Sequence, residues 1–192
     1  TINNNIGVRS AVGTINVSGI LNINNSSTTS SGTAIYQNGI LVFASAHSTF
    51  NSPIEFHQGG LIEVNSGVDT TINGVVTTDT NNAGEILINS GGQLTTGGAI
   101  GSADANLLRI NVKGELIANN NIYAPINLID TRTTSSTLTI ASPGLSLVGG
   151  ISAVTIDGLN TGIAGSLNIS ADYATQGNNI ISLSTIEVNG AE

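Results

Sequence analysis

The sequence RINVKGELIAN, residues 109–119, decides the fold. Apolar and polar side chains alternate on both sides of Gly114, which is the period-two pattern of two short strands joined by a tight corner. Residues 14–24, TINVSGILNIN, share Ile-Asn-Val-x-Gly-x-Leu with this stretch at the same offsets. Looser copies of the unit occur at residues 60–67, 84–94, 166–170 and 185–190. The chain is therefore predicted to repeat one strand–corner–strand unit along its length.

The spacing of the apolar positions predicts how the units are arranged. Anchors recur at a period of roughly 22–24 residues, which lies in the range typical of solenoids; they are Val17, Ile40, Val64, Ile86 and Ile110. One coil cannot bury its apolar side chains alone, whereas stacked coils form a continuous interior. No stretch carries the apolar stripe of an amphipathic helix. We therefore predict an all-β parallel β-solenoid of about eight coils, forming a single segment over residues 1–192.

A second fold class stays open at this point. The two closest copies of the unit begin their shared motif at Ile15 and Ile110, and this separation is near the length of an immunoglobulin-like sandwich. Two tandem β-sandwich domains would also explain that repeat. The shortness of the apolar runs and the scarcity of aromatic residues, 3% of the chain, favour the solenoid.

The composition fits stacked coils. Charged residues make up only 8% of the chain, and stacking uncharged Thr, Ser and Asn side chains on neighbouring coils avoids the repulsion between like charges. Corners need residues that tolerate a positive φ angle. Corners are predicted at the pairs 38–39, 59–60, 73–74, 91–92, 97–98 and 189–190, each of which is Asn-Gly or Gly-Gly.

Charge and residue usage exclude several function classes. The formal net charge is −8 with only four Lys and Arg residues, too few to neutralise the phosphates of a nucleic acid or to dock on an anionic membrane. The chain contains no Cys, so disulfides and thiolate sites are absent. No apolar run reaches the length of a membrane span, and residues 1–5 do not resemble a signal peptide. We expect the chain to be a segment of a longer protein.

The motifs of common enzymes are missing. The sequence contains no phosphate-binding loop and no nucleophile elbow. The strongest candidate for chemistry is Glu55 and His57, which alternation places on one face of a strand with Phe56 opposite. A carboxylate beside an imidazole could orient a general base or begin a metal site. The simpler interpretation, which we favour, is a solvated outward pair with Phe56 in the core.

Two further function classes require particular patterns of residues. A polysaccharide-active β-helix enzyme needs clustered carboxylates, but the acids are spaced singly along the chain. Asp104 is expected to cap a turn and not to begin a calcium loop. An ice-binding array needs Thr-x-Thr in register on every coil, and the sequence offers it only at residues 78–80, 131–133 and 137–139. Structural Thr ladders are the expected explanation. We predict no catalytic, cofactor-binding or metal-binding residues and no cofactor.

The chain resembles the passenger domain of bacterial autotransporters (type V secretion), and among them the rickettsial surface cell antigens. The resemblance rests on Gly-x-Leu-x-Ile-Asn-like repeats at residues 19–24, 84–89 and 114–119, on the bias toward Asn, Thr, Ser, Gly and Ile, and on the lack of Cys. It implies a right-handed parallel β-helix with three short strands per coil. It also implies a location outside the cell, on the bacterial surface, with anchoring through a C-terminal outer-membrane barrel beyond this chain.

The function expected from the resemblance is structural and adhesive, and it is not enzymatic. Loops and faces of the solenoid would bind a host-cell surface protein or glycan, or another copy of the adhesin, and so contribute to virulence. No nucleic acid and no direct membrane insertion by this segment are expected. Open solenoid ends expose unpaired strand edges, so end-to-end self-association is expected unless residues 1–12 or 178–192 form a cap.

Overall fold

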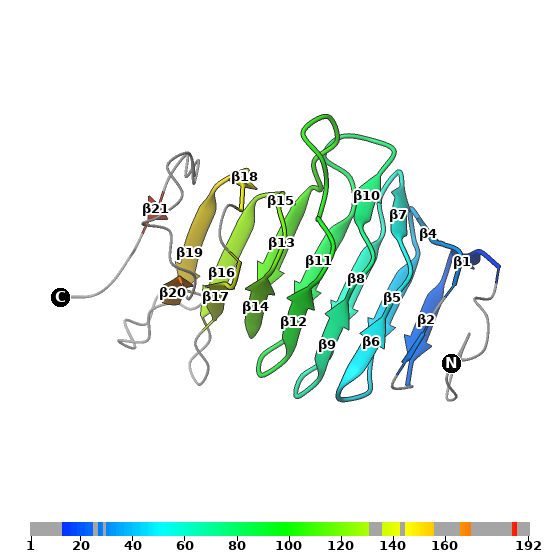
Figure 1. Ribbon diagram of the computed structural model, residues 1–192, viewed down its shortest axis with the longest axis horizontal. Helices are drawn as coiled ribbons and strands as arrows, with labels where there is room; N and C mark the ends of the chain where they lie inside the picture. Colours follow the sequence, from blue (N-terminus) through cyan, green and yellow to red (C-terminus); the bar gives the residue numbers. More distant parts are fainter. Residues whose placement is uncertain are drawn as a thin grey trace.

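The computed structural model describes residues 13–24, 27–28, 30–130, 136–142, 145–155, 166–169 and 186–187. This part of the chain contains 21 β-strands and no helix, hence no helix long and apolar enough to cross a membrane. All strand pairs within it are parallel, and each strand inside a sheet pairs with its equivalents one turn earlier and one turn later. The colours in Figure 1 run in chain order along the stack. The fold is a parallel β-solenoid in which about six turns have strands on all three sides, slightly fewer than the eight coils predicted.

Three sides make up the coil. The eight-stranded sheet contains β2 (Ile20–Ile23), β5 (Ile40–Phe43), β8 (Leu61–Val64), β11 (Glu85–Ile88), β13 (Arg109–Val112), β16 (Ile126–Asp130), β19 (Ile151–Thr155) and β21 (Ile186–Glu187). The seven-stranded sheet contains β3 (Ser27–Thr28), β6 (Ser48–Phe50), β9 (Asp69–Ile72), β12 (Gln93–Thr96), β14 (Glu115–Ala118), β17 (Thr137–Ile140) and β20 (Ser166–Ile169). The third side contains β1 (Ile15–Val17), β4 (Thr33–Tyr36), β7 (Ile54–His57), β10 (Val76–Thr78), β15 (Ile122–Tyr123) and β18 (Leu147–Val148). Single bridges through Ile100 join β10 to β15.

The core is built from inward rows of identical or similar side chains. In the eight-stranded sheet Ile62, Ile86, Ile110 and Ile126 are partners in successive coils, and each is at most 1% exposed. Fully burying such a side chain stabilises the fold by about 1.5–3 kcal/mol. All three phenylalanines of the chain are fully buried near the N-terminal half of the stack: Phe43, Phe50 and Phe56. The core is thus a column of Ile, Val and Leu side chains that also contains three phenylalanine rings in its N-terminal half.

The tandem-sandwich alternative is wrong, because sandwich sheets are antiparallel and these sheets are parallel. The repeat that suggested it has another explanation. Residues 14–24 contain β1 and β2, which meet at the corner between the third side and the eight-stranded sheet. Residues 109–119 contain β13 and β14, which meet at the next corner. The repeated unit therefore encodes one corner and not one coil, so Val17 lies on a different side from the other four anchors.

The predicted period holds in the middle of the stack. Ile62, Ile86 and Ile110 are successive partners, as are Asp69, Gln93 and Glu115. Toward the ends the spacing varies, from Ile15 pairing with Thr33 to Ile151 pairing with Ile186. Residues 79–84 and 101–108 form longer connections before β11 and β13, and they project from the stack at the top of Figure 1.

The corner glycines were predicted for their tolerance of positive φ, and this reason is only partly right. Gly59, Gly60 and Gly91 do adopt positive φ. At Gly74 the reason is different, because a Cβ there would lie closer than 3.0 Å to backbone atoms of Ser52 and Pro53 in the preceding coil. The glycine is needed so that two coils can approach. The predicted corner at residues 189–190 lies outside the described residues, as do residues 1–12 of the proposed cap. Of the other proposed cap, residues 178–192, only β21 is described.

Candidate functional site

The residues with the densest polar contacts form what we call the His57 cluster: Tyr36, Glu55, His57 and Asp79. Alternation along β7 points Glu55 and His57 outward while Phe56 between them is fully buried, which confirms the predicted arrangement. Parallel pairing of β4 with β7 places Tyr36 beside His57. Asp79 directly follows β10, one coil further on, and its backbone N–H donates to the carbonyl of Phe56. Three successive coils therefore meet at the imidazole.

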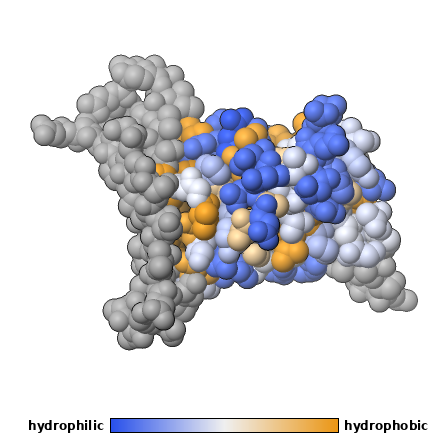
Figure 2. Space-filling view, turned by 90° about the horizontal axis from the view of Figure 1, so that it is seen from above, coloured by the Kyte–Doolittle hydropathy of each residue, from blue (hydrophilic) through white to orange (hydrophobic). Residues whose placement is uncertain are grey.

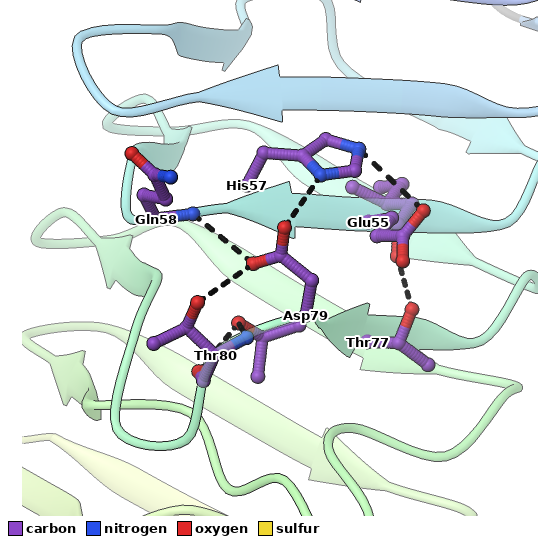
Figure 3. A network of polar contacts seen from close by, with 8 residues as sticks. Glu55, His57, Gln58, Thr77, Asp79 and Thr80 are labelled. Carbon is purple, nitrogen blue, oxygen red and sulfur yellow. Dashed lines mark hydrogen bonds and ion pairs between the residues drawn. The ribbon is translucent and has the colours of Figure 1, made fainter.

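Both ring nitrogens of His57 face carboxylates (Figure 3). Nδ1 lies 2.8 Å from Oδ2 of Asp79, and Nε2 lies 3.5 Å from Oε2 of Glu55. The ring of Tyr36 stacks on the imidazole with a centroid distance of 5.1 Å and an interplanar angle of 22°. The other oxygen of Asp79 accepts hydrogen bonds from the backbone N–H of Gln58 and the hydroxyl of Thr80.

Sequence reasoning found Glu55 and His57 but missed Tyr36 and Asp79. The signal that could have found them is the period itself, because Tyr36 precedes His57 by about one period and Asp79 follows it by about one period. In a parallel solenoid such offsets place side chains side by side on adjacent coils. Carboxylates that are isolated in the sequence, such as Glu55 and Asp79, are therefore brought close to other polar side chains by the stacking of the coils.

The geometry favours an ordering role for His57. A general base needs a ring nitrogen directed at a substrate proton, whereas here the imidazole stands between two carboxylates and beneath a tyrosine ring. Within the described part of the chain, no group of three or more His, Cys, Asp or Glu side chains could hold a metal ion. The cluster thus fixes the positions of Glu55 and Tyr36 on the outer surface of the third side.

The hydrogen bond from His57 is the main reason why the pKa of Asp79 is lowered. Desolvation opposes it, and the hydrogen bonds from Gln58 and Thr80 and the charge of His57 lower the pKa further by smaller amounts. A carboxylate with a lowered folded-state pKa stabilises the fold above its unfolded pKa of about 3.9, and this stabilisation disappears as the pH falls through the folded value. We expect Asp79→Asn to unfold at a lower urea concentration than the parent chain at pH 6. The difference should shrink between pH 4 and pH 2. Asp104→Asn, at an exposed site, is the control and should show a much smaller difference at pH 6.

A second histidine repeats the arrangement on another side of the coil. His47 and Asp69 are again one period apart, and Nδ1 of His47 contacts the carboxylate of Asp69 on the adjacent coil. Asp69 is the register partner of Gln93, whose amide donates to Glu115 at 2.7 Å. The ladder continues to the hydroxyl of Thr139, which lies 3.1 Å from Glu115. Polar ladders of this kind tie outward positions of the seven-stranded sheet together from coil to coil.

Within the described residues, the Thr-rich stretches do not form the two-row array that ice binding requires; the predicted Thr-x-Thr segment at residues 131–133 lies outside them. Thr70 and Thr96 point into the core and are 2% and 1% exposed, and Thr78 is also buried. The outward pairs on successive strands of the seven-stranded sheet are residues 69 and 71, 93 and 95, 115 and 117, and 137 and 139. Only the last pair is Thr-x-Thr. Thr49, Thr71 and Thr95 stack in register as a single structural ladder, as expected.

Asp104 does lie in a turn, although it does not cap it. The turn is closed by the backbone hydrogen bonds between Ser102 and Ala105, and the Ser102 hydroxyl accepts a further bond from the N–H of Ala105. Asp104 itself is exposed. Ser102 occupies the first position of the turn, where a short polar side chain can accept the N–H that closes the turn. Asp104 lies in the middle of the turn and is less well placed to accept it.

Comparisons with protein-family models, with curated proteins and with solved structures return no match. Function must therefore be inferred from the sequence and from the geometry described above.

Proposed function

We propose that this chain is a surface-exposed structural and adhesive segment of a secreted bacterial autotransporter passenger. The observation that carries the proposal is the parallel solenoid itself, in which regular inward rows build a scaffold and the outward positions present polar side chains to the surroundings. Outward polar ladders and the projecting connections at residues 79–84 and 101–108 give this scaffold a surface suited to recognition. Figure 2 shows that the side bearing these connections is mainly hydrophilic.

The lack of Cys supports export as part of the proposal. A chain that crosses membranes before folding gains from having no thiols that could form disulfides on the way. Stacked coils also suit folding after export, since each coil contacts only its neighbours and a first coil can template the next. Placement on the bacterial surface and binding of a host protein, a host glycan or another copy of the adhesin follow from the same proposal.

The test is adhesion of the isolated chain to cells. We expect fluorescent beads coated with the protein to bind cultured epithelial cells saturably, and the soluble chain to compete with them. A variant in which residues 101–108 are replaced by a short Gly-Ser linker tests whether the longer projecting connection takes part. Beads coated with serum albumin are the control. Binding equal to the albumin control, or binding that the free chain fails to compete, would contradict the adhesive role.

A polysaccharide-active enzyme is the second candidate, and one observation favours it. Glu55 and Asp79 both contact His57, so two carboxylates do lie close together on the third side. Glycosidases need their two carboxylates on opposite faces of a sugar with room for it between them. Here the imidazole occupies the space between the two groups, which supports binding over hydrolysis. Release of reducing ends from a polysaccharide, abolished by both Glu55→Gln and Asp79→Asn, would reverse this preference.

A further inference from the structure

A hollow opens beside the His57 cluster, on the outer surface of the third side. Its volume is about 320 Å³, and its lining includes Thr14, Ser31, Ala34, Pro53, Glu55 and Thr77. The register explains why it exists. Asn16, Ala34, Glu55 and Thr77 are outward partners on four successive coils, and the short side chain of Ala34 leaves a gap in this row.

The groups around the hollow are hydroxyls, one carboxylate and small apolar surfaces. The side chains of Thr14, Ser31 and Thr77 supply hydroxyls, and Glu55 supplies an acceptor that is half exposed. Tyr36 lies two residues from Ala34 along β4, on the same outward side, and is 44% exposed. This mixture of a few polar groups with an aromatic ring and small apolar contacts is typical of sites that bind polyhydroxylated ligands.

Charge narrows the ligand class. Glu55 and Asp79 make the surroundings of the hollow negative, and the basic residues among the described ones, Arg109 and Lys113, lie on later coils. An acidic sugar or a phosphate would be repelled there, because its negative charge would meet no cation. A neutral sugar instead can donate its hydroxyl protons to the carboxylate of Glu55 and place its apolar face against Ala34 or Pro53.

The neighbouring cluster holds two of these groups in place before any ligand arrives. The imidazole of His57 lies 3.5 Å from the carboxylate of Glu55 and stacks against the ring of Tyr36. His57 is itself held by Asp79, which accepts from Gln58 and Thr80. Side chains that are already ordered lose less conformational entropy on binding. Ordering Glu55 and Tyr36 gives the network a role at the surface in addition to linking adjacent coils.

We propose that the hollow over Ala34 binds one unit of a neutral glycan, with Glu55 as the hydrogen-bond acceptor and Ala34 and Pro53 as the apolar contacts. The volume is at the lower end of the range for ligand sites, about 300–1,000 Å³, which suits a single hexose. The inference deepens the proposed adhesive function, since it identifies one ligand class and its place. It depends on that function only for its biological meaning, because sugar binding can be measured on the isolated chain.

The test is an amide NMR titration of the ¹⁵N-labelled chain. The neutral probes are lactose, maltotriose, cellotriose and chitotriose, and the acidic probes are sialyllactose and trigalacturonate. We expect at least one neutral probe to shift the amides of residues 31–36 and 54–57 saturably, with a dissociation constant on the order of 1 mM, as one small site permits. The acidic probes should leave these amides unchanged.

Two variants locate the site. Ala34→Leu fills the hollow and Glu55→Gln removes the charged acceptor while keeping its shape, and each should weaken binding of the neutral probe at least tenfold. Thr95→Leu, on the outward ladder of the seven-stranded sheet, is the matched control and should bind as the parent does. The amide spectrum of each variant also shows whether it is folded, and Glu55→Gln gives the answer if Ala34→Leu fails to fold.

The inference is overturned if no neutral probe shifts these amides, if acidic probes shift them equally, or if Glu55→Gln binds as the parent chain does. Its failure differs from failure of the adhesive function. Beads that adhere to cells equally well with the parent chain and with Glu55→Gln leave adhesion standing and remove the sugar site from it. Sugar binding without any cell adhesion would leave the site standing and contradict the adhesive role.

Discussion

Phe56→Ala is expected to lower the free energy of unfolding by about 3–5 kcal/mol, the range for removing a fully buried aromatic side chain. Phe56 is 0% exposed, and a Cβ added at Gly84 in the next coil would overlap its ring. The ring of Phe56 therefore packs directly against Gly84, and no larger residue would fit at position 84. Since coils on both sides depend on this layer, the cavity cannot be closed by moving one loop.

Urea unfolding followed by far-UV circular dichroism measures the effect. The matched control is Tyr36→Ala, which removes an aromatic ring of similar size from the outward face of β4, one coil earlier. Tyr36 is 44% exposed, so its removal should lower the free energy of unfolding by about 1 kcal/mol or less, in line with surface substitutions. Equal losses for the two variants would show that the assignment of inward and outward faces on this side is wrong.

The sequence predicted the fold class because the inward positions obey two simple periods. Alternation along each strand identified Val64 and Ile86 as core residues, and the longer repeat from coil to coil predicted the stacking. The sides of the coil were harder to assign. The same Ile-Asn-Val-x-Gly-x-Leu unit serves two different corners, since the local geometry of a strand that turns at a glycine is alike at both. Pattern alone thus predicted corners well and coil boundaries poorly.

The His57 cluster was only half predictable for a related reason. Glu55 and His57 lie on one strand, where alternation is a local rule. Tyr36 and Asp79 join them through stacking, and their offsets from His57 become informative only after the register is known. The hollow over Ala34 was not predictable at all, because a cavity depends on the relative lengths of side chains on neighbouring coils. To predict such a cavity, one must know the register of every strand pair and not only the length of the repeat.

Gly74→Ala is the second substitution with a large expected effect. A Cβ at residue 74 would lie closer than 3.0 Å to the carbonyl group of Ser52 and to the nitrogen of Pro53, all of them backbone atoms that cannot rotate away. Ser52 cannot shift freely either, because its buried hydroxyl accepts from the N–H of Ser30 at 2.6 Å. The two coils must therefore separate at this corner, with an expected loss of about 2–3 kcal/mol or more, the upper range for overpacking.

The control for Gly74→Ala is the same chemical change at a corner without crowding. Gly19 and Gly32 have no heavy atom within 4 Å of an added Cβ, and neither adopts a positive φ. Alanine at these positions should leave stability unchanged or raise it by about 0.4–1 kcal/mol, since it restricts the unfolded chain. The contrast separates two reasons for a corner glycine, because a general need for flexibility would make all three substitutions equally harmful. If instead only Gly74→Ala lowers the urea midpoint, close approach of the coils is what the corner glycine provides.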